Sequence, residues 1–95
     1  MPRAKKPRPK AQPAPKSLHK PEYKVVLKTL QQLREDADLL QSELGKKLGR
    51  SQSYVSMAER GAIRLDALQL KDWCKACDSS LSAFVKKLEQ QWGDA

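Results

Sequence analysis

Two cysteines separated by two residues are the first candidates for chemistry in this chain. The segment Trp73-Cys-Lys-Ala-Cys77 has the spacing of a redox-active dithiol, in which a thiolate of low pKa attacks a disulfide. Such a motif needs a preceding strand in a βαβ framework, and no segment alternates apolar and polar residues long enough to predict a strand. Helical spacing instead places Leu70 and Trp73 on one apolar stripe with both cysteines. We therefore expect the two thiols to fill the core as small hydrophobic groups.

The rest of the sequence offers no constellation for catalysis or metal binding. A zinc site would need further ligands, and the single histidine, His19, stands alone in the N-terminal stretch. No acid–base pair, activated nucleophile or phosphate-binding loop is recognisable. The sequence therefore predicts a protein that is not an enzyme and that has no metal, no cofactor and no small-molecule ligand.

A second group of polar residues is suited to recognition rather than to catalysis. Its members lie off the apolar stripe near the start of a short predicted helix: Ser51, Gln52, Ser53, Ser56 and Met57. A glutamine can bond N6 and N7 of adenine, and a serine donates or accepts as required. A helix N-terminus also favours an adjacent phosphate. Without further context, however, the same residues on an exposed helix would simply be solvated.

These side chains need helices to position them, and the pattern after residue 21 is helical. Apolar residues recur at steps of three and four in the first of these segments, at Tyr23, Val26, Leu27, Leu30 and Leu33. We predict helices over residues 22–36, 41–48, 52–60, 66–77 and 81–91. Pro21 suits a first helical turn, Asp66 and Gln69 can form a capping box, and Ser80 can cap the last helix.

The two central helices are expected to cross closely at a glycine turn. Leu44 and Leu48 face Val55 and Ala58 across Gly49, which can adopt the left-handed conformation that a tight interhelical turn needs. The neighbouring Gly45 is small enough to let the two helices approach one another. The fold class is therefore all-α: a compact five-helix domain over residues 22–95.

Positive charge is concentrated at the N-terminus. Residues 1–21 contain seven Lys and Arg, no acid and all six prolines, whereas the remaining 12 basic and 11 acidic residues nearly cancel. A segment of this composition cannot bury a core, so residues 1–21 are predicted to be a disordered basic arm. This arm is expected either to bind nucleic acid, along the backbone or in the minor groove, or to serve as a solubility extension.

The stretch from Gln41 to Gly61 resembles the Cro/Xre-type, phage-repressor-like helix-turn-helix family. The resemblance rests on Gln41, Leu44, Gly49, Ser51, Val55 and Glu59-Arg-Gly61, and it extends through Arg50-Ser-Gln-Ser-Tyr-Val-Ser56 and Arg64-Leu-Asp66. It covers roughly residues 25–88. It implies a lambda-repressor-like domain that binds double-stranded DNA, with its motif at 41–60 and a recognition helix at about 51–60 in the major groove. The implied activity is sequence-specific transcriptional regulation, by a repressor that occupies its operator.

The resemblance also implies roles for individual residues. Arg34 and Glu59 correspond to a structural ion pair, and Gln41 corresponds to a glutamine that contacts phosphate. Base-reading positions correspond to Ser51, Gln52, Ser53, Ser56 and Met57. Arg60 and Arg64 correspond to positions that reach backbone phosphate, and Arg50 is expected to contact the backbone as well. Lys46 and Lys47 either form a solvated face or lie near the backbone, and Tyr54 either bonds a phosphate or packs on the preceding helix.

Three positions depart from the family pattern. Leu40 replaces the usual Ser or Thr cap, so the helix after it is expected to begin less sharply. Gly45 replaces an alanine, at a cost of up to about 1 kcal/mol in helix propensity. Met57 replaces a polar or basic residue, which favours contact with a thymine methyl group.

Partners beyond DNA are also suggested by the last predicted helix. Its apolar residues Phe84, Leu88 and Trp92 are expected to form a homodimer contact, because helix-turn-helix proteins usually read paired half-sites. The alternative function is a protein-interaction module, as in antitoxins or bridging cofactors of this fold. No apolar run reaches membrane-span length, so we expect a cytoplasmic, nucleoid-associated protein of a bacterium or phage.

Overall fold

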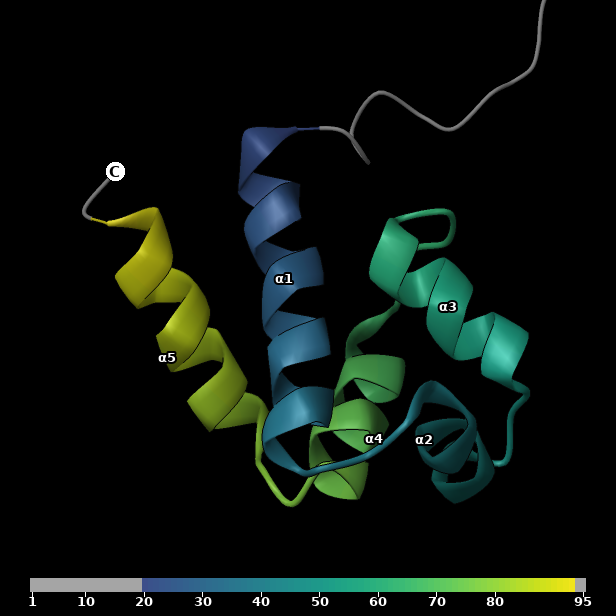
Figure 1. Ribbon diagram of the computed structural model, residues 1–95. Helices are drawn as coiled ribbons and strands as arrows, with labels where there is room; N and C mark the ends of the chain where they lie inside the picture. The colour runs from purple at the N-terminus through teal and green to yellow at the C-terminus, as the bar shows by residue number, and fades with distance from the viewer. Residues whose placement is uncertain (1–19, 94–95) are drawn as a thin grey trace, which may run out of the picture.

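The computed structural model describes residues 20–93, which form five helices and no strand (Figure 1). The helices are α1 (Pro21–Asp36), α2 (Gln41–Leu48), α3 (Gln52–Arg60), α4 (Ala67–Ala76) and α5 (Leu81–Trp92). The predicted all-α fold is thus confirmed, and every predicted helix end lies within one residue of the observed one. Of the predicted basic arm, residues 1–19 lie outside the described residues, and Pro21 is the first residue of α1.

Side-chain caps define where three of the helices begin. Ser51 Oγ accepts the Tyr54 N–H at 3.2 Å at the start of α3, and Ser80 Oγ accepts the Ala83 N–H at 3.1 Å at the start of α5. Asp66 and Gln69 form the predicted capping box at α4, with both hydrogen bonds 2.8 Å long. Each cap satisfies backbone donors that would otherwise lack partners, and this explains the sharp boundaries.

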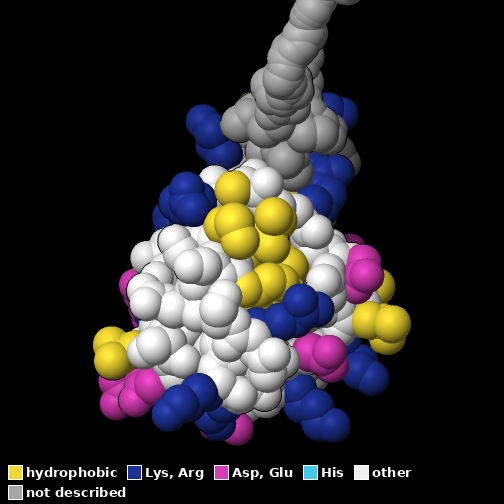
Figure 2. Space-filling model, turned by 90° about the vertical axis from the view of Figure 1, so that its right-hand side faces the viewer, with side chains coloured by type: hydrophobic (Ala, Val, Ile, Leu, Met, Phe, Trp, Pro, Cys, Tyr) yellow, Lys and Arg dark blue, Asp and Glu magenta, His cyan; other side chains and the backbone are white. Residues whose placement is uncertain are grey.

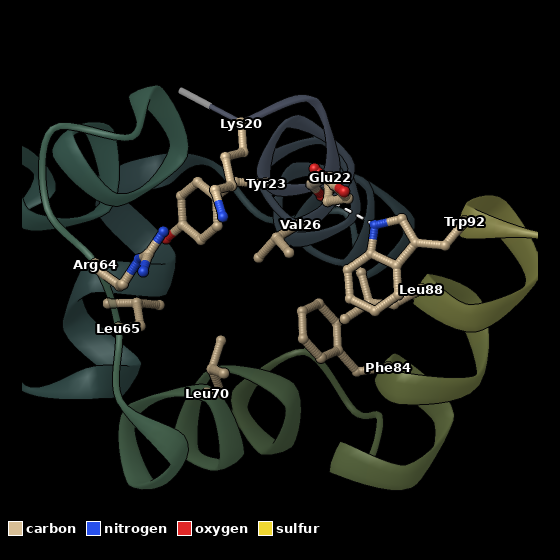
Figure 3. A pocket seen from close by; sticks show the side chains of 10 residues that line it. All are labelled: Lys20, Glu22, Tyr23, Val26, Arg64, Leu65, Leu70, Phe84, Leu88 and Trp92. Carbon is tan, nitrogen blue, oxygen red and sulfur yellow. Dashed lines mark hydrogen bonds between the residues drawn. The ribbon is translucent and has the colours of Figure 1, made fainter. Parts of the chain in front are cut away.

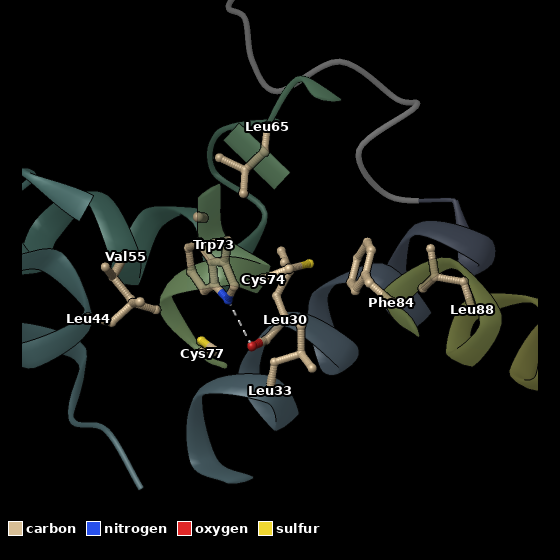
Figure 4. Close-up of a cluster of buried hydrophobic side chains, with 11 residues drawn as sticks. Leu30, Leu33, Leu44, Val55, Leu65, Trp73, Cys74, Cys77, Phe84 and Leu88 are labelled. Atoms are coloured by element: carbon tan, nitrogen blue, oxygen red, sulfur yellow. Dashed lines mark hydrogen bonds between the residues drawn. The ribbon is translucent and has the colours of Figure 1, made fainter. Parts of the chain in front are cut away.

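The core lies where all five helices meet, around Trp73 of α4 (Figure 4). Trp73 is fully buried, and its indole N–H donates to the Leu30 carbonyl of α1 at 3.1 Å. Leu44 and Val55 bring α2 and α3 into the same cluster, and Phe84 brings in α5. No helix in the range 20–93 is long and apolar enough to cross a membrane. The core thus sets how α3 is presented on one side of the molecule.

The structure corrects the predicted dimer contact on α5. Phe84 is 1% exposed and Leu88 is 6% exposed, because both side chains pack into the domain's own core. They are therefore not available to a second copy. The apolar residues that α5 leaves exposed are Val85 and Trp92. For Phe84 and Leu88 the prediction was wrong because helical periodicity identifies an apolar stripe but not which neighbour covers it, whereas a contact through Trp92 stays a prediction.

The Cys-Lys-Ala-Cys segment has the environment of core residues. Cys74 is fully buried and Cys77 nearly so, on the inner face of α4. Burial raises the pKa of each thiol to about 11. A redox dithiol needs the opposite shift, toward an exposed thiolate. The expectation that both cysteines pack as hydrophobic groups is confirmed.

We expect Cys74 and Cys77 to resist a thiol reagent such as DTNB at pH 8 while the protein is folded. A pKa raised from 9 to about 11 lowers the thiolate fraction by about two orders of magnitude, and burial also blocks access. Unfolding in guanidinium should therefore accelerate labelling by at least about a hundredfold. Rapid labelling of the folded protein, or ready oxidation to a Cys74–Cys77 disulfide, would contradict this assignment.

Candidate nucleic-acid interface

The turn between α2 and α3 places the two helices in close contact. Gly49 adopts a left-handed φ of 70°, and the Arg50 N–H donates to the Gly45 carbonyl at 2.8 Å. A Cβ at Gly45 would lie 2.9 Å from the Ser51 carbonyl oxygen and 3.0 Å from that of Arg50. The contact is with backbone, which cannot move aside easily. The close contact of α2 with the start of α3 therefore requires glycine at position 45. The packing that this contact allows offsets the cost of Gly45 in helix propensity.

One face of α3 is buried and the opposite face is open to solvent. Val55 and Ala58 are fully buried against the core. The predicted base-reading residues lie elsewhere on the helix: Ser51, Gln52 and Ser53 are exposed, and Ser56 and Met57 are half-buried. Positions 52, 53, 56 and 57 share a helical face, because they are separated by one, four and five residues. The structure therefore brings this predicted set together on one surface.

A hydrogen-bonded network runs from the core to Gln52. Arg34 donates to both carboxylate oxygens of Glu59, from Nε at 2.6 Å and from Nη2 at 3.2 Å. The Gln41 side-chain amide donates to the same carboxylate at 3.0 Å, and its oxygen accepts from Gln52 Nε2 at 3.3 Å. A buried pair between α1 and α3 thereby holds the glutamine that opens α2, which in turn contacts the exposed Gln52.

The Arg34–Glu59 pair is well shielded from solvent. Only 11% of the Arg34 side chain and 6% of the Glu59 side chain are exposed. The hydrogen bond with Glu59 raises the pKa of Arg34 above its usual range, so this guanidinium stays charged. Arg34 also donates to the Leu39 carbonyl at 2.8 Å, which ties the α1–α2 connection to the same pair. The structural ion pair implied by the sequence resemblance is present.

The face around α3 carries an excess of positive charge. Residues 41–66, from the start of α2 to the residue before α4, contain five basic residues and three acids, and one of these acids, Glu59, is paired with Arg34. Figure 2 shows this side of the molecule, with Lys and Arg side chains bordering a hydrophobic streak. The exposed cations of this stretch are Lys46, Lys47, Arg50, Arg60 and Arg64. The near-neutral domain is therefore locally basic where the predicted recognition helix lies.

Comparison with known proteins agrees with this geometry. A helix-turn-helix family model matches residues 30–84. The chain belongs to the Cro/Xre-type helix-turn-helix family. An XRE-family like protein from Pseudomonas syringae pv. tomato str. DC3000 is similar, at 35% identity and a TM-score of 0.73, over 82% of this chain and 95% of that one. The family comprises DNA-binding transcription regulators, not enzymes, and this chain is accordingly a DNA-binding transcription regulator.

A more distant relative shares the fold. The clp gene regulator ClgR from C. glutamicum is 21% identical, with a TM-score of 0.67 over 76% of this chain and 94% of that chain. No match was found among curated proteins.

Two arginine–tyrosine contacts flank the helix-turn-helix, and sequence reasoning missed both. The Arg50 guanidinium lies 4.7 Å from the ring centre of Tyr54, and that of Arg64 lies 4.5 Å from the ring centre of Tyr23 in α1. Tyr54 is half-buried against the core, and burial raises the pKa of its phenol. The packing expected for Tyr54 is therefore observed, and its contact with phosphate stays a prediction. The Arg50–Tyr54 pair has a local spacing of four residues that the sequence displays, whereas Tyr23 and Arg64 are distant in the chain and only the fold brings them together.

The start of α2 shows the consequence of the missing hydroxyl cap. Leu40 has no side-chain acceptor, so only the reciprocal half of a capping box forms, with Glu43 Oε1 accepting the Leu40 N–H at 2.8 Å. The helix nevertheless begins at Gln41, as predicted. Its first turn is thus held by Glu43 and by the bond from Gln41 to Glu59.

We expect Glu59→Gln to lower the free energy of unfolding by about 3 kcal/mol, because it leaves the Arg34 charge poorly solvated and without a counter-ion. In the double-mutant cycle of Arg34→Met and Glu59→Leu, the double variant should lose much less stability than the sum of the two single variants. Urea denaturation of the parent, both single variants and the double variant measures this coupling. Glu89→Gln, which removes an exposed carboxylate from α5, is the control and should change stability by less than about 0.5 kcal/mol. Additive losses would show that the pair contributes nothing as a unit.

Proposed function

We propose that this helix-turn-helix regulator is a sequence-specific repressor that inserts α3 into the major groove of its operator and excludes RNA polymerase. The observation that carries the proposal is the exposed outer face of α3, where Gln52 is pre-positioned by Gln41. A major groove admits one α-helix, and its base edges offer distinct donors and acceptors to such side chains. A side chain held in one orientation before binding loses less conformational entropy on contact.

Base selection is assigned to five residues of this surface. Gln52 is proposed to bond adenine through N6 and N7, and Ser51 and Ser53 to bond neighbouring base edges. Met57 is half-buried and apolar, which suits contact with a thymine methyl group. Ser56 accepts a hydrogen bond from Arg60 Nε at 3.3 Å, so we propose that its base contact follows displacement of that arginine toward phosphate.

Backbone contacts are proposed for residues that surround this face without entering the groove. Arg60 ends α3, and Lys46 and Lys47 end α2, so all three lie beside the helix that would occupy the groove. Contacts of this kind fix register and add affinity without selecting sequence. The same role is proposed for Gln41, Arg50, Tyr54 and Arg64.

Pairing of two copies is proposed to depend on DNA. Helix-turn-helix proteins usually bind half-sites one helical turn apart. Because Phe84 and Leu88 are buried in the core, the large apolar side chains that α5 exposes are only Val85 and Trp92. Such a surface falls short of the roughly 800 Å² per partner of a standard stable interface. We therefore propose that two copies meet on the operator rather than before it.

We expect Gln52→Ala to lose about 1–3 kcal/mol of binding at one base position and to relax the preference there. Selection of bound sequences from random DNA, run beside the parent, measures both the preference and the symmetry of the site. Gln90→Ala, an equally exposed glutamine on α5, is the control and should leave the selected sequence unchanged. Equal weakening of Gln52→Ala on selected and random DNA would show that another element reads the bases.

Transcription from a promoter that overlaps the selected site tests the direction of regulation. Repression should decline in parallel with occupancy in the Gln52→Ala variant. Stimulation of transcription by the parent protein would contradict operator occlusion as the mechanism.

We expect removal of residues 1–19 to weaken binding to all DNA sequences and to reduce its salt dependence. This stretch carries six Lys and Arg and no acid, and each phosphate that it neutralises adds about 0.9 to the slope of log K against log salt. Binding of the full and shortened chains to the same site at several salt concentrations measures the difference. An unchanged slope would mean that this segment does not contact the DNA backbone.

A further inference from the structure

An apolar groove, open to solvent and called the cavity below, lies on the surface of the helical bundle. It has a volume of about 490 Å³ and lies between α1, α4, α5 and the segment that follows α3 (Figure 3). Its walls are aromatic and aliphatic side chains, chiefly Tyr23, Val26, Leu65, Leu70, Phe84 and Trp92. Ligand sites in proteins have volumes of about 300–1,000 Å³ and linings of this kind. The cavity is therefore large enough to admit a small organic molecule.

The walls of the cavity are held in place by the fold itself. Phe84 is 1% exposed and Leu65 is 7% exposed, so these side chains belong to the core as well as to the cavity. Trp92 is fixed by a 3.0 Å hydrogen bond from its indole N–H to the Glu22 carbonyl. On the opposite side, the guanidinium of Arg64 covers the ring of Tyr23. A pre-formed site of this kind binds with little loss of conformational entropy.

Charge at the cavity is distributed unevenly. Lys20 and Arg64 both lie on the side of Tyr23, whereas Glu22 lies beside Trp92 at the other end (Figure 3). A molecule with an apolar body and a negative group would therefore be oriented by the two cations. A cationic group is disfavoured at the end that carries Lys20 and Arg64. This argues against residues 1–19 as the occupant, because that segment carries six basic residues and no acid.

We propose that this cavity binds an amphipathic carboxylate with a medium-length aliphatic chain. The carboxylate is placed at Lys20 and Arg64, and the chain lies among Val26, Leu70 and Phe84 toward Trp92. Arg64 suits this role because a guanidinium presents paired donors that match a carboxylate. The site is separate from the proposed base-reading face, and it departs from the expectation that the chain has no small-molecule ligand.

The test follows the two indole N–H resonances in ¹H–¹⁵N NMR spectra during titration with decanoate below its micelle concentration. Trp92 lines the cavity and Trp73 does not, so decanoate should shift the Trp92 resonance saturably and leave that of Trp73 nearly unchanged. Decanol has the same chain without the charge. We expect it to bind about fivefold more weakly, since each exposed charge pair contributes only modestly. Decyltrimethylammonium, with the opposite charge, should bind more weakly still.

Variants separate the charge requirement from the apolar requirement. Lys20→Gln with Arg64→Gln should abolish the preference for decanoate over decanol, while both still bind. Lys86→Gln, which removes an exposed cation from the outer side of α5, is the matched control and should keep the preference. Val26→Phe should fill the cavity and weaken both probes by at least about tenfold. Circular dichroism and the unchanged Trp73 resonance verify that each variant is folded.

Several results would overturn the proposal. An unresponsive Trp92, or equal affinities of the parent protein for decanoate and decanol, would show that no anion site exists. A site that opens only when residues 1–19 are removed would identify that segment as the occupant. A Trp92 resonance that shifts with protein concentration alone would identify a second copy of the chain instead.

Discussion

The ion pair between Arg34 and Glu59 connects the core of this protein to the helix α3. It joins α1 to the last turn of α3 through two hydrogen bonds, and both side chains are largely shielded from water. Removing two charges from water is unfavourable unless their mutual geometry and remaining hydrogen bonds compensate. Here Gln41 and the Leu39 carbonyl provide those additional bonds. A helix of nine residues would be marginal by itself, so α3 depends on such tertiary contacts for its position.

The consequences of this pair extend to the exposed side chains of α3. Glu59 holds Gln41, and Gln41 holds Gln52, so the orientation of an exposed side chain traces back to a buried carboxylate. Gly45 contributes to the same geometry in another way, because only a residue without Cβ allows the close approach of the α2–α3 turn. In the proposed function, a few rigidly placed polar groups select the bases, and the surrounding cations supply nonspecific attraction.

The two surfaces of the molecule differ in the chemistry that they offer. The α3 side is polar and basic, which suits a nucleic acid, whereas the cavity between α1, α4 and α5 is apolar with cations at one end. Arg64 takes part in both proposals, because it follows α3 in the chain and covers Tyr23 at the cavity. Arg64 therefore belongs to both surfaces, whereas the other residues proposed for DNA binding do not line the cavity.

Much of the fold and of the candidate site could be predicted from local sequence signals. The helix boundaries followed from periodicity, from Gly49 and from the caps at Ser51, Asp66 and Ser80, all of which act within a few residues. The family pattern implied the Arg34–Glu59 pair and the set of residues on α3. By contrast, the burial of Phe84 and Leu88 was not predicted, and the contact of Arg64 with the distant Tyr23 was missed.

The difference has one physical reason. Hydrogen bonds along a helix, caps and glycine turns involve neighbours in the chain, so the sequence alone determined five helices and an exposed polar face on α3. Which apolar residue is buried, and by what, depends on partners distant in sequence, as with Trp73 and Leu30, which lie 43 residues apart. Only the tertiary structure could decide that α5 uses Phe84 and Leu88 for its own core. It alone revealed the cavity beside them, because a cavity is a property of how the helices pack.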